Sequence, residues 1–185
     1  FGCSGLAVIL VIGVIAIVDL VPNAFEWAGN QIELEKQREA LARRWQAPKD
    51  DASPETFFPA KVSGYGLIKH DTEAAIPALR FDIPGWHARY RTADSRIDVF
   101  VYQVTDLERE ALFGRIEDTH EDDESSAKRI TRMGYRCFYK STRLHQNHFW
   151  WIKGWLLVFR TEDSEDREAF VREFLKTATA SPPAI

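Results

Sequence analysis

The sequence predicts an α+β protein with a single N-terminal transmembrane helix, a juxtamembrane stalk helix, and an antiparallel β-sheet domain with two helices packed on one face. Three observations predict this class: an uncharged apolar run near the N-terminus, two β-hairpin patterns, and two amphipathic helical patterns. We expect a transmembrane anchor at 1–25, a stalk helix and polar linker at 26–55, a globular domain at 56–180, and a tail at 181–185.

The anchor is predicted from residues 5–18, which contain no charged or strongly polar side chain. With its uncharged flanks, this run approaches the ~20 residues that cross roughly 30 Å of hydrocarbon. Phe25 and Trp27 follow, where aromatic rings favour the lipid–water boundary. Three interpretations of Cys3 are open: acylation after a cleaved signal, palmitoylation, and an unmodified cysteine at the membrane edge. The apolar anchor residues are Leu6, Val8, Ile9, Leu10, Val11, Ile12, Val14, Ile15, Ile17 and Val18.

The stalk helix is predicted over residues 30–45, which hold strong helix formers and no glycine or proline after position 30. Its apolar residues are too sparse for a full core-facing stripe. Two interpretations follow: a solvated stalk, or a helix that packs against a partner subunit near the membrane. Residues 47–55 are polar and carry two prolines, as is typical of a linker.

Two hairpins form the centre of the predicted sheet. Turn-forming residues 92–95 join the first pair of strands, and the Lys153–Gly154 pair joins the second. We expect 71–77 to be a loop or a brief helical turn and 81–85 to be a turn. The predicted strands are a short one ending near 70, then 86–91, 96–104, 132–143, 148–153 and 155–161.

The first of the two domain helices is predicted over residues 105–118. Thr105 and Glu108 have the spacing of a capping box, in which each side chain satisfies a backbone N–H of the other residue. The segment 117–126 is almost wholly acidic and small, and we expect it to be an exposed loop.

The closing helix is predicted to begin after Ser164, with acidic residues in its first turn, where the helix dipole favours them. Its apolar residues recur at helical spacing and predict a buried face. The residues on this face are Phe170, Val171, Phe174, Leu175 and Ala178.

Composition and motifs argue against several classes of function. The chain has 24 Lys and Arg against 28 Asp and Glu, so we expect no nucleic-acid partner. Nucleotide-binding, nucleophile-elbow, haem and zinc-protease motifs are absent from the sequence, so we expect no cofactor, no metal and no catalytic residue. His145 and His148 are three residues apart but straddle a predicted turn, and the acidic residues around His120 lack the register of a calcium loop.

Large aromatic side chains dominate residues 148–159, HFWWIKGWLLVF. In a strand, neighbouring residues face opposite sides, so one aromatic row is expected to exceed what a one-sided core accepts. Core packing and contact with a protein or lipid partner are both interpretations of this run. The candidate partner contacts along the chain are Phe25, Trp27, Trp45, Trp150, Trp151 and Trp155.

These patterns predict a non-catalytic accessory or assembly subunit of a larger membrane protein complex, such as an electron-transfer, photosynthetic or transport complex. The expected partners are integral membrane protein subunits and the lipid bilayer. The basic residues after the anchor, taken alone, would place the domain in the cytoplasm, but they alternate with glutamates. We expect a bacterial single-pass protein with an extracytoplasmic (periplasmic) domain. The alternative is a membrane-anchored extracytoplasmic sensor or small-ligand-binding module.

Overall fold

The computed structural model describes residues 29–30, 32–49, 52–76, 81–121, 127–132, 135–141, 146–161 and 167–178. The chain forms two compact units, residues 1–40 and residues 41–185. Within the described residues, no helix combines the length and the apolar character needed to cross a membrane. The predicted anchor lies outside the described residues.

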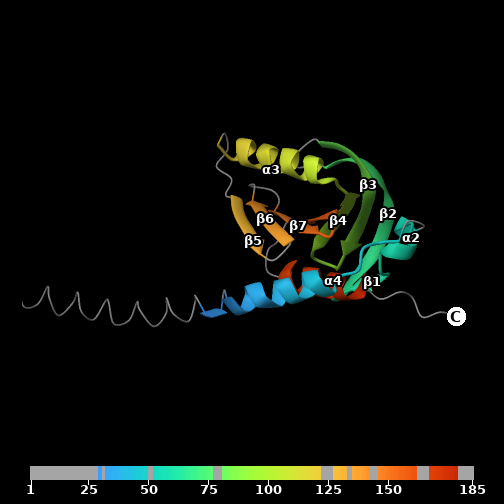
Figure 1. Ribbon diagram of the computed structural model, residues 1–185. Helices are drawn as coiled ribbons and strands as arrows, with labels where there is room; N and C mark the ends of the chain where they lie inside the picture. The colour runs from blue at the N-terminus through green and yellow to red at the C-terminus, as the bar shows by residue number, and fades with distance from the viewer. Residues whose placement is uncertain are drawn as a thin grey trace, which may run out of the picture. The chain divides into compact units, whose positions relative to one another are not determined.

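The second unit contains one sheet of eight antiparallel strands in the order β1-β2-β3-β4-β8-β7-β6-β5 (Figure 1). This confirms the α+β class and the antiparallel sheet. Strands β4 and β8 pair at the centre and join the two halves. The elements are α2 (Pro54–Phe57), β1 (Lys61–Val62), β2 (Tyr65–Ile76), β3 (Phe81–Arg91), β4 (Arg96–Gln103), α3 (Asp106–Glu121), β5 (Ala127–Arg132), β6 (Tyr135–Ser141), β7 (Gln146–Ile152), β8 (Trp155–Thr161) and α4 (Arg167–Thr177).

Both predicted hairpins are present, as β3–β4 and β7–β8. Lys153 and Gly154 form the second turn with φ angles of 49° and 80°. Two successive left-handed residues match the twist of the flanking strands, and this explains how a two-residue connection closes the β7–β8 hairpin.

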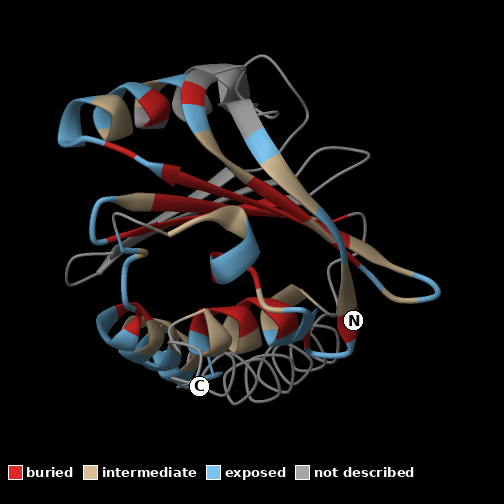
Figure 2. Cartoon of the chain, turned by 90° about the vertical axis from the view of Figure 1, so that its right-hand side faces the viewer, coloured by how far each residue is buried: buried red, intermediate tan, exposed pale blue. Residues whose placement is uncertain are grey.

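Helices α3 and α4 lie on opposite faces of the sheet, so the prediction that both pack on one face was wrong (Figure 1 and Figure 2). Val99 and Val101 of β4 join the core beneath α4. Phe100 and Tyr102 alternate with them and join a second core with Leu112 of α3. The central strands are apolar on both sides, and each side needs its own cover to keep water out.

The α4 core confirms the buried face predicted for the closing helix, where Phe170, Val171, Phe174 and Leu175 are all buried. Its aromatic rings pack edge to face against the sheet. The ring centroids of Phe170 and Tyr90 are 5.2 Å apart, and those of Phe174 and Phe159 are 5.4 Å apart. Such contacts add to the stabilisation that comes from apolar burial.

The predicted capping box opens α3. The Thr105 N–H donates to Glu108 Oε2 at 2.6 Å, and the Glu108 N–H donates to Thr105 Oγ1 at 3.2 Å. The helix continues to Glu121, so residues 117–121 are helical rather than part of a loop. This stretch contains neither glycine nor proline to end the helix.

Strands β2 and β3 are longer than predicted and include residues 71–76 and 81–85, which we expected to be irregular. The pairing shifts register between Glu73 and Ala75. Pro84 falls opposite this irregularity, where the ladder does not need the N–H that proline lacks. A bulge therefore keeps a proline within a paired strand.

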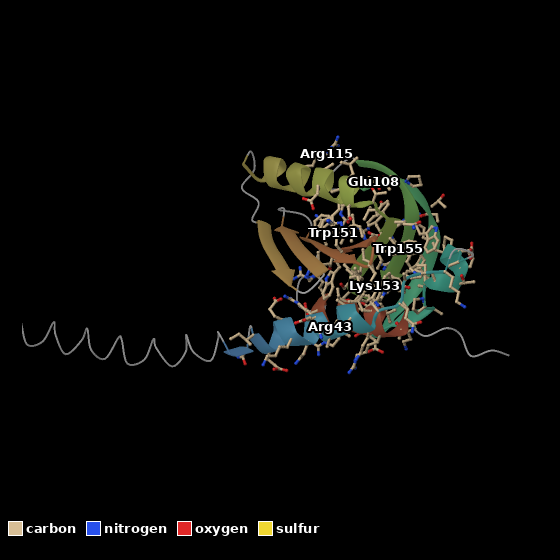
Figure 3. All side chains as sticks on the ribbon, in the orientation of Figure 1. Arg43, Glu108, Arg115, Trp151, Lys153 and Trp155 are labelled. Atoms are coloured by element: carbon tan, nitrogen blue, oxygen red, sulfur yellow. The ribbon has the colours of Figure 1, made fainter. Side chains whose placement is uncertain are left out.

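The predicted stalk helix is present at 29–30 and 32–44, and its last turn belongs to the second unit. Trp45, directly after it, is 0% exposed and joins the α4 core. The Lys153 Nζ donates to the carbonyl oxygens of Trp45 at 2.6 Å and Arg43 at 3.1 Å (Figure 3). A lysine at a helix C-terminus satisfies carbonyls that lack helical partners and favours the dipole.

Replacing Lys153 with methionine should release this helix end, because two carbonyls lose their cationic donor. We expect faster tryptic cleavage after Arg43 and Arg44, measured by mass spectrometry of timed digests. The exposed Lys61, replaced by methionine, is the control and should leave cleavage unchanged. Equal cleavage in both variants would mean that Lys153 does not hold the helix end.

Replacing Gly85 with alanine should destabilise the fold. The added Cβ would lie 2.3 Å from Cδ1 of the fully buried Tyr102 and 2.8 Å from the Val101 carbonyl oxygen. We expect a loss of about 1–3 kcal/mol in the free energy of unfolding, measured in urea. Gly66→Ala in β2 is the control, since nothing lies within 4 Å of its Cβ position.

Candidate functional site

A pocket of about 370 Å³ opens on the α4 side of the sheet. Thr72, Trp86 and Val101 are successive cross-strand partners on β2, β3 and β4, so their side chains share this face. Gln103 and Trp155 are the next cross-strand pair, on β4 and β8. The complete lining is Thr72, Pro84, Gly85, Trp86, Val101, Gln103 and Trp155.

The indole rings of Trp86 and Trp155 form part of the pocket lining. The ring centroids of Trp86 and Trp155 are 5.8 Å apart with a 40° tilt, and both residues pack against the α4 core. The ring of Phe57 in α2 packs against that of Trp86, with the ring centroids 5.5 Å apart. Half-buried tryptophans offer a broad apolar surface and an N–H donor, so they suit an apolar or aromatic group with a polar edge.

The pocket lining offers apolar contact and a few hydrogen-bonding groups. Its only polar side chains are those of Thr72, Gln103 and the two indoles, and none of the lining residues ionises. General acid–base catalysis and activated nucleophiles require a titratable group at the reacting atoms. Across the part of the chain that the structure describes, no three His, Cys, Asp or Glu side chains form a potential metal site.

The α3 side of the same strands carries a charged network centred on His87. Its Nδ1 lies 2.9 Å from Asp71 Oδ1, and its Nε2 lies 2.9 Å from Asp98 Oδ1. Ionised carboxylates only accept hydrogen bonds, so the ring makes both bonds at once when both nitrogens carry protons. The Phe100 ring stacks on the imidazole at 4.5 Å, and the Arg89 Nε donates to Asp98 Oδ1 at 2.8 Å.

These partners lower the pKa values of both carboxyls. The hydrogen bond from Lys69 is the main cause for Asp71, with His87 adding to it. Burial alone would raise the pKa of Asp98, but the hydrogen bonds from His87 and Arg89 outweigh it and hold the pKa below its usual value. The network therefore stabilises the fold while its carboxylates are ionised.

The aromatic residues proposed as partner contacts occupy different places. Trp45, Trp150 and Trp151 are at most 4% exposed and belong to the cores, so they are not available to a partner. Adjacent Trp150 and Trp151 point to opposite faces, and each face has a core to receive one ring. Trp155 lines the pocket (Figure 3). Phe25, Trp27 and the anchor residues lie outside the described residues.

Sequence reasoning missed Trp86, Gln103 and the His87 network. The signal for them was the register of the first hairpin, since its four-residue loop places Trp86 opposite Val101 and Arg89 opposite Asp98. Trp86 and Trp155 come together only because β4 pairs with β8, far along the chain. No local pattern specifies that pairing.

Comparison with known proteins adds evidence about the fold alone. No protein-family model and no curated protein sequence matches the chain. A solved structure of a GTP binding regulator from Thermotoga maritima is similar, with a TM-score of 0.51 and 18% sequence identity. The match covers 71% of this chain and 88% of that one. The chain is an α+β domain whose sheet carries a pocket lined in part by two tryptophans.

Replacing Asp98 with asparagine should make the free energy of unfolding depend less on pH in the acidic range. A carboxyl with a lowered folded pKa stabilises the fold above its unfolded pKa of about 3.9, and this contribution is lost as pH falls. We expect the variant to be about 1–3 kcal/mol less stable at pH 7 and the difference to shrink at pH 3. Urea titrations from pH 3 to pH 7 would show a constant difference if Asp98 were not ionised in the fold.

Proposed function

We propose that this chain is a non-catalytic accessory or assembly subunit of a larger membrane protein complex, held by one transmembrane helix. The observation that carries the proposal is the pocket between Trp86 and Trp155, which has binding surface and no ionisable side chain. Tryptophans are enriched among the residues that carry most of the binding energy at protein–protein interfaces. An apolar or aromatic side chain of a partner subunit is the occupant that suits this lining.

The apolar run at residues 5–18 supports the membrane part of the proposal. It holds no ionisable group that could carry ions or protons, so its role is that of an anchor. We further propose that the domain lies on the extracytoplasmic side. The side is tested by adding protease to cells whose outer envelope is opened while the inner membrane stays intact, and to fully permeabilised cells. Cleavage of the domain in the first sample supports the extracytoplasmic side. Cleavage only in the second sample contradicts it.

The experiment for the complex is copurification in mild detergent with integral membrane proteins identified by mass spectrometry. Gln103 is an exposed residue of the pocket wall, so Gln103→Glu adds a charge there without burying it in the core. We expect the amount of copurifying subunits to fall at least about tenfold in this variant, because an apolar group of the partner would meet an unpaired carboxylate.

The matched control is Gln46→Glu, the same chemical change at an exposed position away from the pocket lining. It should copurify the same subunits as the unaltered chain. Recovery of the chain only as a free monomer would overturn the proposal. Equal recovery of subunits by both variants would support membership in the complex but would show that the pocket is not part of the interface.

The volume of the pocket favours a second candidate, a membrane-anchored sensor or small-ligand-binding module. Ligand pockets commonly enclose roughly 300–1,000 Å³, and this one lies at the lower end. A small aromatic or apolar ligand would raise the melting temperature of the purified chain in proportion to its occupancy. That shift should disappear in Gln103→Glu and persist in Gln46→Glu.

A further inference from the structure

A cluster of cationic side chains lies on the α3 side of the sheet, at the end where β4 begins. Cross-strand pairing places these residues on one face, because directly paired residues and residues two apart point the same way. Lys69 pairs with Arg89, and Arg91 pairs with Arg96. We call these four residues the cationic cluster. Arg160 of β8 pairs with Asp98 and extends it.

The cluster contains two like-charge pairs placed directly opposite each other, Lys69 with Arg89 and Arg91 with Arg96. Like charges at directly opposed positions of an antiparallel pair destabilise the sheet. Asp71 offsets part of this repulsion through its 2.6 Å contact with Lys69, and Asp98 offsets part through Arg89. Among the described residues, the four cationic side chains of the cluster outnumber the two carboxylates that contact them, in a chain whose net charge is −4.

The buried carboxylate of Asp98 orients the arginines. It accepts from the Arg89 Nε at 2.8 Å, and the Arg96 Nε lies 3.5 Å from its other oxygen. Both arginine side chains remain more than one-third exposed, at 37% and 38%. A guanidinium held by Nε keeps its Nη donors in a fixed plane, which is the arrangement that binds a carboxylate in bidentate fashion.

We propose that the cationic cluster binds an acidic segment of a protein partner. Directly opposed residues are about 5 Å apart and positions two apart on a strand are about 7 Å apart, so carboxylates at alternate positions of an extended segment match this grid. The negative segment would relieve the repulsion within both like-charge pairs. The nature of the partner, a protein subunit, rests on the proposed function.

A protein segment suits the cluster better than a membrane surface. Lys69, Arg89 and Arg96 are each half-covered by neighbouring side chains, and a flat bilayer meets the most protruding side chains first. The cluster also contains two carboxylates between its cations, which favours a partner whose charges are spaced rather than continuous.

The test uses the full chain in mild detergent and a fluorescent octa-glutamate peptide. Arg91 is exposed and has no ion pair with a described residue, so Arg91→Glu leaves the Asp98 contacts in place. We expect Arg91→Glu to bind the peptide about fivefold or more weakly than the unaltered chain does. Binding by the unaltered chain should itself weaken as the salt concentration rises. The melting temperature should not fall, since the variant replaces a like-charge pair with an opposite-charge pair.

Arg115→Glu is the control, the same charge reversal at an exposed position on α3, and it should bind the peptide as the unaltered chain does. Equal binding by the two variants would overturn the proposal. So would binding of the unaltered chain to vesicles that contain phosphatidylglycerol but not to the peptide. Failure of the unaltered chain to copurify any membrane subunit would overturn the proposed function instead, because the peptide assay does not depend on the complex.

Discussion

The two-sided apolar character of the β4–β8 pair is the constraint on which the rest of the structure depends. Every β4 residue from Ile97 to Tyr102 is buried, only Arg96 and Gln103 at its ends are not, and β8 is buried almost as completely. A pair of strands with no polar face cannot stay at the surface, so α3 must cover one side and α4 the other. The aromatic residues of β7 follow the same rule, since Trp150 and Trp151 each enter a different core.

This arrangement also determines where the binding surfaces that we propose lie. Near the ends of the central strands some side chains stay partly exposed, namely Trp86 and Trp155 at one end and Arg89 and Arg96 at the other. At one end, on the α4 side, Trp86 and Trp155 frame an apolar pocket. At the other end, on the α3 side, arginines surround Asp98. The two binding sites that we propose lie on opposite faces of the sheet, so an occupant of one would leave the other accessible.

The sequence predicts those features that arise from neighbouring residues. The Thr105–Glu108 capping box, the Lys153–Gly154 turn and the buried face of α4 each depend on a short segment, and the structure contains all three. The pairing of β4 with β8 joins residues about sixty positions apart, and nothing local specifies it. The pocket follows from that pairing and from the β2–β3 register, and the cationic cluster follows from the β2–β3 register and the β3–β4 hairpin; neither was predicted. The apolar residues on both faces of β4 are visible in the sequence and predict a central strand covered on both sides, which the predicted placement of both helices on one face did not provide.

The place of Trp45 changes where the folding unit begins. This ring is fully buried among the side chains of the α4 core, and Lys153 binds the two carbonyls beside it. A shortened chain that starts at residue 56 would leave an indole-sized void in the core and a lysine without its acceptors. We therefore expect a stable shortened chain to retain Trp45 and the end of the helix before it, and to begin upstream of residue 41.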